Sequence, residues 1–262
     1  MSESRFSRFL SKLRHSFRKR LRLDRPNDTD RAFLARMPEA HRARLASFLR
    51  RSESQICQDL FALSVLGFKR GGFFVEFGAA DGRGLSNTWL LEKHFGWRGI
   101  LSEPARSYAQ KLRSHRACAI DHRCVWNRTG EMIAFREASN RVLSTIALFS
   151  EGDMHAAARK EGVTYEVPTI SLGDLLAEHG APADPDFLSI DTEGSELAIL
   201  SALDFDRWSF KVICCEHAYT EARGPIFELL SAKGYARVHQ EISQYDDWYV
   251  RRDVLRAGGT AA

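Results

Sequence analysis

Residues 73–84 read FFVEFGAADGRG, and this stretch decides the fold. Four of its first five residues are bulky and apolar, as in the short buried strands of a parallel sheet, and a glycine-containing turn follows directly. Ligands of such sheets bind beyond the carboxyl ends of the strands, so the turn marks an expected binding place. A turn that binds a pyrophosphate reads G-x-G-x-x-G, but Ala80 stands where the second glycine belongs. A dinucleotide, and with it an NAD-linked oxidoreductase, is therefore disfavoured.

Beyond this stretch, short β-rich runs alternate with helix-like runs, which is typical of a parallel sheet covered by helices on both faces. The sequence therefore predicts an α/β domain built on a doubly wound sheet. The expected helices span 87–95, 104–114, 172–180, 195–203 and 225–233. The expected strands, in addition to 73–77, span 99–102, 117–120, 132–135, 164–170 at a sheet edge, 186–190, 210–215, 235–240 and 248–251.

The composition is that of an ordinary soluble protein. The chain has 262 residues and a mass of 29.7 kDa, with 44% hydrophobic and 27% charged residues, which fits one large domain with an extension. A membrane-spanning helix is excluded, since the longest apolar run, 61–68, falls far short of the roughly 20 residues that a bilayer requires. The five cysteines form no C-x-x-C pair, which favours a reducing compartment, the cytoplasm, over a disulfide framework.

Charge divides the chain into two parts. Residues 1–54 contain 15 Lys or Arg against 6 Asp or Glu, whereas the remainder contains 23 against 28. Two parts of opposite charge have different neighbours or different roles. We therefore expect a basic, partly amphipathic helical extension over 1–53, a main domain over 54–254 and a flexible tail over 255–262.

Within the extension, residues 4–22 place apolar side chains at three- and four-residue steps among many Arg and Lys residues. Such a helix fits peripheral contact with the anionic inner face of a membrane, but a solvated tail, a packing helix and an organelle-targeting peptide stay open. Nucleic acid is not an expected partner, because no recognition module accompanies the basic stretch. The polar residues 25–30, RPNDTD, predict a linker.

Acidic residues accompany the first two expected strands. Glu76 lies in the first, beside the glycine turn, and Glu103 follows the second, 25 residues after Gly78. An acidic strand end beside such a turn suits a ligand with ammonium and sulfonium charges, which S-adenosylmethionine carries. A carboxylate at the position of Glu103 also matches the vicinal hydroxyls of a ribose. The sequence therefore indicates S-adenosylmethionine rather than a phosphate-rich cofactor.

Two further expected strands also end in polar groups. Asp191 and Glu193 follow one, and Glu216 and His217 end the other, so these side chains are expected at one edge of the sheet. His217 is the first candidate for a general base, because an unperturbed pKa near 6.5 leaves it largely neutral, and Asp191 or Glu193 would orient it. Alternatively, Asp191, Glu193 and Glu216 would hold a divalent cation such as Mg²⁺, and the sequence leaves the metal undecided. Glu196 is explained by the dipole of the helix that it begins.

Five segments occur in order and at fitting spacing: FFVEFGAADGRGLSNTWLLEKHFGWRGILSEP, VPTISLGDLL, DFLSIDTEGSELAIL, ICCEH and DDWYV. In this combination the chain resembles, over about residues 54–251, the FkbM family of S-adenosylmethionine-dependent methyltransferases. The resemblance implies a Rossmann-like class I methyltransferase fold of seven strands in which the last pair reverses direction.

The resemblance also implies roles for single residues and a reaction. Glu103 would bind the ribose, Asp191 would lie near the methionine end or the reacting group, and adenine would pack near 121–125. Members of the family methylate hydroxyls, so the expected acceptor is a glycan, a lipid-linked sugar or a secondary metabolite. The alternative is a non-catalytic protein that binds the cofactor or the acceptor for another enzyme. The residues implied for the cofactor loop are Glu76, Gly78, Asp81 and Gly82.

Overall fold

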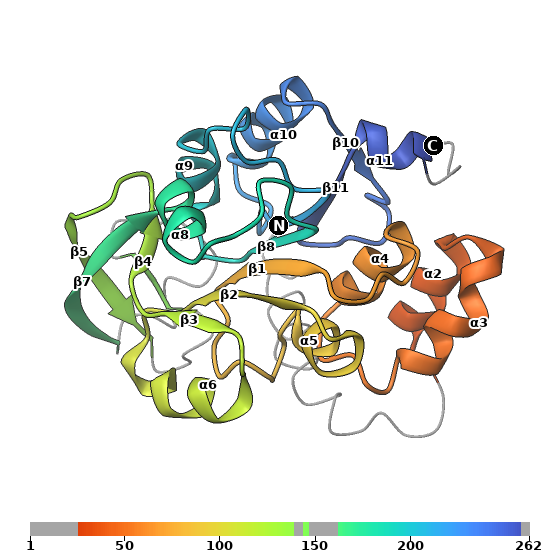
Figure 1. Cartoon of the computed structure of the whole chain (residues 1–262), viewed down its shortest axis with the longest axis horizontal. Coiled ribbons are helices and arrows are strands. Elements are labelled where there is room, and N and C mark those ends of the chain that lie inside the picture. Colours follow the sequence, from red (N-terminus) through yellow and green to blue (C-terminus); the bar gives the residue numbers. More distant parts are fainter. Residues whose placement is uncertain (1–25, 139–143, 147–161, 258–262) are drawn as a thin grey trace, which may run out of the picture.

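The computed structural model describes residues 26–138, 144–146 and 162–257, and within them the chain forms two sheets with helices around them (Figure 1). The basic segment 4–22 and residues 258–262 of the expected tail lie outside the described residues. The larger sheet has seven strands in the order β10 (Tyr235–Val238), β11 (Asp246–Arg251), β9 (Val212–Glu216), β8 (Phe187–Ile190), β1 (Phe73–Phe77), β2 (Arg98–Ser102) and β3 (Ala119–Asp121).

Strand direction differs from the expectation at one edge of this sheet. The strands from β9 to β3 pair in parallel, whereas β11 pairs antiparallel with both β9 and β10. Because two reversals cancel, β10 runs in the same direction as the parallel strands, and only β11 is reversed. The expectation that the last pair reverses is therefore corrected to one strand.

The larger sheet is buried on both faces, and β1 shows why. All five of its residues are buried, with Phe74 in one hydrophobic cluster and its neighbours Val75 and Phe77 in the other. Alternate residues of a strand point to opposite faces, so an almost continuously apolar run fits a sheet covered on both sides. Three helices that each follow or precede a strand of this sheet contribute to the first cluster: α4 (Gln58–Val65), α5 (Trp89–Phe95) and α6 (Ala109–His115). Three others contribute to the second cluster: α8 (Leu172–Glu178), α9 (Glu196–Ser201) and α10 (Arg223–Ala232).

Two N-terminal helices join the same core. In α2 (Asp28–Arg36) and α3 (Glu39–Phe48), the buried residues Phe33 and Leu45 belong to the cluster that covers Phe74. The expected linker over 25–30 is wrong in its second half, because Asn27 caps α2 in a reciprocal capping box with Asp30. At the other end, residues 255–257, expected in a flexible tail, complete the helix α11 (Arg252–Ala257).

The smaller sheet was not expected as a separate unit. It has the order β4 (Cys124–Trp126), β7 (Val163–Ser171), β5 (Met132–Glu137) and β6 (Thr145–Ile146), and it lies at the end of the molecule opposite to α2 and α3 (Figure 1). The prediction of β7 as an edge strand is wrong, since β7 pairs with β4 on one side and with β5 on the other. Among the described helices, none has the length and apolar character needed to span a bilayer.

Candidate functional site

The loop after β1 meets the end of β8 at Gly78. This glycine has φ +70°, and a Cβ atom added to it would lie 1.9 Å from the carbonyl oxygen of Asp191. Both the left-handed backbone and the close approach therefore require glycine at this position. The contact places the glycine turn and the acidic end of β8 directly side by side, as expected for neighbouring parallel strands.

Glu103, at the end of β2, ties the second strand to the same turn. Its carboxylate is buried and accepts hydrogen bonds from the backbone N–H of Ala80 at 2.8 Å and of Ala105 at 2.9 Å. Burial raises the pKa of Glu103 to about 7, with a further contribution from the Glu137 charge, although the two N–H groups act in the opposite direction. Ala80, where a dinucleotide turn has glycine, adopts the left-handed region at φ +48°.

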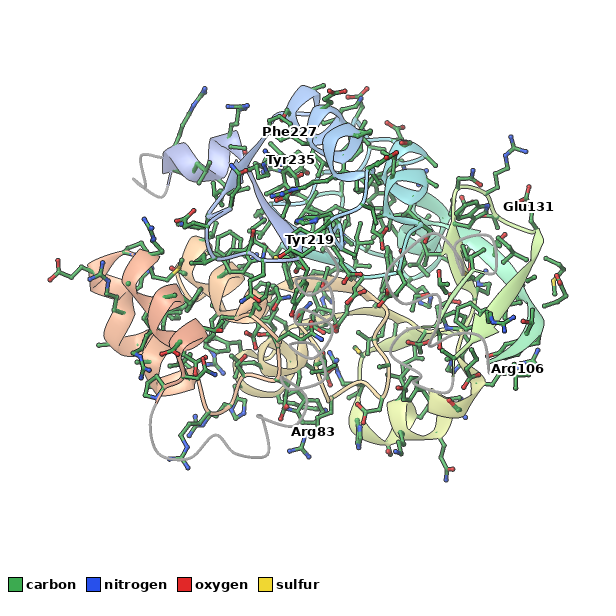
Figure 2. All side chains as sticks on the ribbon, turned by 180° about the vertical axis from the view of Figure 1, so that it is seen from behind. Arg83, Arg106, Glu131, Tyr219, Phe227 and Tyr235 are labelled. Carbon is green, nitrogen blue, oxygen red and sulfur yellow. The ribbon has the colours of Figure 1, made fainter. Side chains whose placement is uncertain are left out.

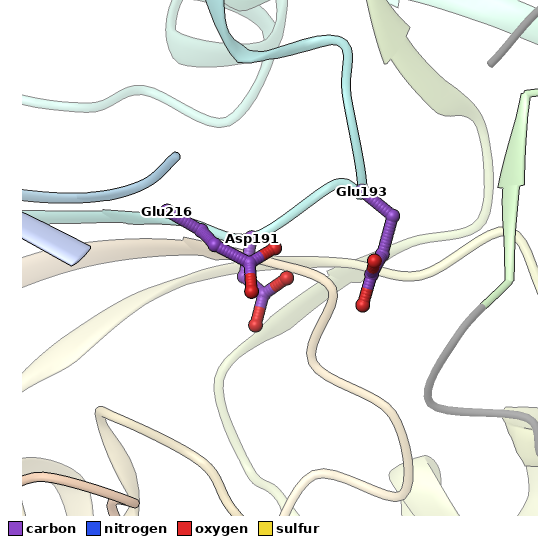
Figure 3. A group of neighbouring side chains, drawn as sticks. All are labelled: Asp191, Glu193 and Glu216. Carbon is purple, nitrogen blue, oxygen red and sulfur yellow. The ribbon is translucent and has the colours of Figure 1, made fainter. Parts of the chain in front are cut away.

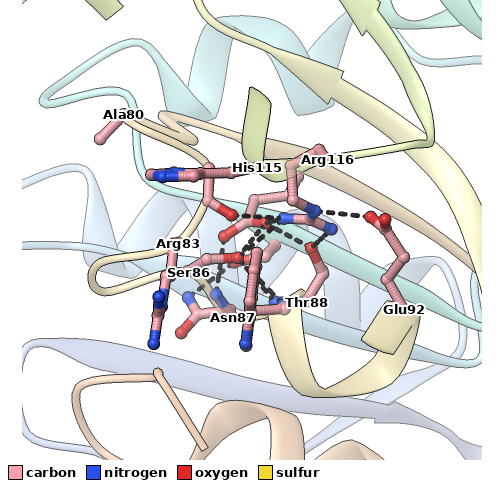
Figure 4. A network of polar contacts seen from close by, with 12 residues as sticks. Ala80, Arg83, Ser86, Asn87, Thr88, Glu92, His115 and Arg116 are labelled. Atoms are coloured by element: carbon pink, nitrogen blue, oxygen red, sulfur yellow. Dashed lines mark hydrogen bonds and ion pairs between the residues drawn. The ribbon is translucent and has the colours of Figure 1, made fainter. Parts of the chain in front are cut away.

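Glu76 makes contacts that hold the loop following the glycine turn. Its oxygens accept from the Ser86 hydroxyl at 2.9 Å, the Asn87 N–H at 2.7 Å and the Thr88 hydroxyl (Figure 4). Only 3% of Glu76 is exposed. The cofactor contact expected for Glu76 stays a prediction, but its role in fixing residues 86–88 is visible in the structure.

Arg116 completes this network, and sequence reasoning missed it. Its side chain is fully buried and bonds to Glu92 through Nε at 2.5 Å, to the Gly82 carbonyl at 3.1 Å and to the hydroxyls of Ser86 at 3.1 Å and Thr88 at 2.8 Å (Figure 4). A single arginine between an expected helix and an expected strand carries no motif, so no sequence signal marks it. Arg116 and Glu76 thus both bond to Ser86 and Thr88 and hold the loop after the glycine turn.

The other two predicted turn residues have local roles. The Asp81 carboxylate accepts from the N–H groups of Arg83 at 3.0 Å and Gly84 at 2.8 Å, which closes the turn on itself. Gly82 has φ +78°, and a Cβ atom there would lie 2.5 Å from the Leu112 side chain. Both residues therefore shape the turn, whatever it binds.

Three carboxylates converge at the same edge of the sheet, two from the loop that follows β8 and one from the end of β9. Asp191, Glu193 and Glu216 each offer an oxygen, and these oxygens lie within 4.8 Å of one another (Figure 3). Glu193 and Glu216 are buried, and Asp191 is half-buried. Like charges this close repel strongly in a partly dry site, and hard oxygen ligands in such a group suit Mg²⁺. We call these three side chains the acidic cluster.

His217 follows Glu216 but stands outside the acidic cluster. It is buried, its Nδ1 accepts the backbone N–H of Tyr219 at 2.9 Å, and its Nε2 lies 3.8 Å from an Asp247 carboxylate oxygen. An imidazole whose Nδ1 accepts a hydrogen bond carries its proton on Nε2, so neither nitrogen is left to take another proton. Burial also lowers the pKa of His217, although the Asp247 charge opposes this. The role of His217 as a base stays a prediction that this geometry disfavours.

Two regions border the site. The exposed Tyr219 follows His217 at the end of β9, with Ala218 and Tyr219 both in the left-handed region at φ +43° and +59° (Figure 2). Near the expected adenine position, the buried carboxylate of Asp121 bonds to Arg123 at 2.7 Å and to His179 at 3.2 Å. The expectation that adenine packs near 121–125 stays a prediction.

A family model described as the methyltransferase FkbM domain matches residues 76–247. The chain belongs to the FkbM methyltransferase family. The resemblance seen in the sequence motifs is therefore confirmed, and the matched range contains the glycine turn, Glu103 and the acidic cluster. A search of curated proteins finds no match to this FkbM methyltransferase.

Similar solved structures include other methyltransferases. An FkbM methyltransferase from Methylobacillus flagellatus KT has 14% sequence identity and a TM-score of 0.43, with 85% of this chain and 58% of that chain covered. Precorrin-6y C5,15-methyltransferase from Geobacter metallireducens GS-15 has 16% identity and a TM-score of 0.37, with 73% and 84% covered. A TehB-like SAM-dependent methyltransferase from Corynebacterium glutamicum has 10% identity and a TM-score of 0.36, with 81% and 97% covered.

Proposed function

We propose that this FkbM methyltransferase transfers the methyl group of S-adenosylmethionine to a hydroxyl of a glycan, a lipid-linked sugar or a secondary metabolite. The observation that carries the proposal is the meeting of three features at one sheet edge: the turn at Gly78, the buried Glu103 and the acidic cluster. The lipid-linked option rests on the basic segment 4–22, which lies outside the described residues.

The residues present fit S-adenosylmethionine. Each oxygen of Glu103 accepts one backbone N–H, and a carboxylate oxygen has capacity for a second hydrogen bond, so two ribose hydroxyls have acceptors here. The negative charges of the acidic cluster suit a ligand that carries ammonium and sulfonium groups. At Gly78, the missing side chain lets backbone from two strands approach closely at the edge where the ligand is expected.

When bound, S-adenosylmethionine supplies a methyl group on a positively charged sulfur, so an attacking hydroxyl oxygen gains the methyl carbon while the electron pair of the C–S bond stays on sulfur. The chain must align the hydroxyl and accept its proton. Alignment at about 3–3.5 Å supplies several kcal/mol of the rate enhancement. Asp191 is the most open carboxylate of the acidic cluster, so we assign the proton to its oxygen. His217 would first have to release the Tyr219 N–H.

A divalent cation is the alternative way to use the acidic cluster. Asp191, Glu193 and Glu216 would hold Mg²⁺, which lowers the pKa of a hydroxyl that it binds. Adding EDTA to an active assay separates the two versions. Unchanged turnover would exclude a role for a divalent cation. A loss of turnover that Mg²⁺ restores would exclude the version in which Asp191 accepts the proton without a cation.

The proposal is tested by calorimetric titration with S-adenosylmethionine, followed by an assay for S-adenosylhomocysteine over a panel of hydroxylated acceptors. We expect Glu103→Gln to weaken cofactor binding at least tenfold, because the amide replaces one acceptor by a donor. Glu228→Gln, an exposed acid on α10, is the matched control and should bind as the wild type does. Cofactor binding without product for every acceptor would instead support the non-catalytic alternative.

A further inference from the structure

The loop between β8 and α9 is held through its N–H groups by Glu196. Oε1 of this carboxylate accepts from the N–H of Thr192 at 2.9 Å, the hydroxyl of Thr192 at 2.9 Å and the N–H of Gly194 at 3.1 Å, and Oε2 accepts from the N–H of Gly194 at 3.1 Å. Glu196 is buried. Its side chain therefore reaches back from the first turn of α9 to the residues on either side of Glu193, which a favourable helix dipole alone does not require.

The same loop is held through its carbonyl groups by the smaller sheet. The hydroxyl of Thr145, on β6, lies 3.2 Å from the carbonyl oxygen of Thr192 and 3.0 Å from that of Glu193, and Thr145 is buried. The loop is thus bonded on one side to its own following helix and on the other to a strand about fifty residues earlier in the chain.

Glu193, which lies between these contacts, has an unfavourable backbone conformation and unfavourable neighbouring charges. Glu193 has φ +58°, in the region that favours glycine, and its carboxylate lies beside those of Asp191 and Glu216. A strained backbone and like-charge repulsion both oppose this arrangement, so other contacts must maintain it. The bonds to Glu196 and Thr145 are placed to do so.

We propose that Glu196 and Thr145 are positioning residues that hold the carboxylate of Glu193 in the acidic cluster. The use of Glu193 in catalysis or cation binding rests on the proposed function, whereas the positioning itself does not. This role explains why an acid at position 196 is buried with its oxygens directed to loop N–H groups. It also links the smaller sheet to the reacting edge of the larger sheet.

The test is a double-mutant cycle on stability without any ligand. In the wild type, Glu193→Gln removes one of three mutually repelling charges, so the urea midpoint should rise. In the Glu196→Ala background, Glu193 is no longer held against the other carboxylates, so the same substitution should shift the midpoint by less than half as much. Glu196→Gln removes the same charge, which lies close enough to Glu216 to interact with it, but keeps Oε1, which accepts three of the four bonds. This background should therefore retain most of the wild-type shift.

Two controls sharpen the cycle. Asp174→Asn changes a first-turn acid of α8 that bonds to Ser171, and in this background Glu193→Gln should have its wild-type effect. Thr145→Val removes only the hydroxyl contact and should reduce the effect partly. An equal shift from Glu193→Gln in all backgrounds would overturn the proposal, and so would a full wild-type shift in Glu196→Ala alone.

A second measurement uses Mn²⁺ as the probe. If the acidic cluster binds the cation, Glu196→Ala should weaken Mn²⁺ binding by about the same factor as Glu193→Gln, and the double variant should be no weaker than either single variant. Additive losses would contradict positioning. Failure of the wild type to bind Mn²⁺ would reject the cation version of the proposed function, while the stability cycle would still decide the role of Glu196.

Discussion

Gly78 shows how one missing side chain shapes the site at the residue scale. A Cβ atom at this position would lie 1.9 Å from a backbone carbonyl oxygen, an atom that cannot turn aside as the end of a flexible side chain can. Relief of this clash would move the ends of β1 and β8 apart at the place where the acidic cluster begins. The position therefore couples local backbone geometry to the arrangement of Asp191.

We predict that Gly78→Ala lowers the free energy of unfolding by about 3–5 kcal/mol, because it adds a backbone clash to the cost of a left-handed φ. Gly71→Ala is the control, since Gly71 has a similar φ of +65° but no atom within 4 Å of an added Cβ. That variant should lose only about 1–2 kcal/mol. Urea unfolding measures both changes, and equal losses would show that the two strand ends separate freely.

At the scale of elements, Arg116 joins parts that the sequence separates. It lies just after α6 and bonds to Glu92 on α5 and to the loop that Glu76 of β1 also holds. A buried charge pair is costly to break, because removing one partner leaves the other without compensation. The guanidinium group of Arg116 thus links α5 to the loop that follows the glycine turn.

We predict that Arg116→Met destabilises the protein by about 3–5 kcal/mol, whereas Arg31→Met, which breaks the exposed pair with Asp28, changes stability by at most about 1 kcal/mol. Stability is measured by urea unfolding between pH 7 and pH 3. A destabilisation of Arg116→Met no larger than that of Arg31→Met would contradict the prediction.

The pH dependence of the free energy of unfolding provides a second test of the ion pair between Glu92 and Arg116. Burial raises the pKa of Glu92, but the Arg116 charge and the bonds from Ala117, Arg116 and Lys93 outweigh it and lower this pKa to about 2. A lowered pKa stabilises the fold above the unfolded value of about 4.5, and this stability is lost as pH falls towards 2. Arg116→Met should therefore be less sensitive to acid over this range than the wild type.

At the scale of the whole molecule, the described part of the N-terminal extension belongs to the main core. Phe33 meets Trp248 of β11 edge to face at 6.3 Å between ring centroids, and Phe48 meets Phe95 of α5 at 5.0 Å. Burying one large apolar side chain contributes about 1.5–3 kcal/mol. Several such side chains on α2 and α3 together approach the net stability of about 5–15 kcal/mol that is typical of a domain.

Removal of residues 1–49 should therefore abolish cooperative unfolding, because it strips these side chains from the core. Removal of residues 1–25 should leave the melting temperature within a few degrees of the wild type, since it keeps the packing of Phe33 against Trp248 and of Phe48 against Phe95. Thermal unfolding followed by circular dichroism distinguishes the two truncations. A cooperative transition at the wild-type temperature in the shorter chain would show that the fold begins after α3.

Much of the fold was predictable from local sequence. The bounds of β1 agree with the predicted strand, because a short apolar run ended by a glycine turn is a local signal. Ser171 caps α8 as predicted, since capping involves neighbours in the chain. The direction of β10 and the pairing of β7 were predicted wrongly, because strand partners are chosen by segments far apart in sequence.

The sequence by itself determined the chemistry available at the site: the glycine turn, Glu103 and the carboxylates that form the acidic cluster all follow strands whose ends must meet at one edge. Only the tertiary structure decided how these groups are held. No local pattern encodes the proximity of the residues that hold them. These are the bonds of Glu76 to residues 86–88, the contacts of Arg116, and the bonds of Glu196 and Thr145 to the loop between β8 and α9. The physical reason is that hydrogen bonds and charge pairs depend on distances between side chains, which packing sets, whereas strand position depends on the apolar pattern, which the chain carries in its order of residues.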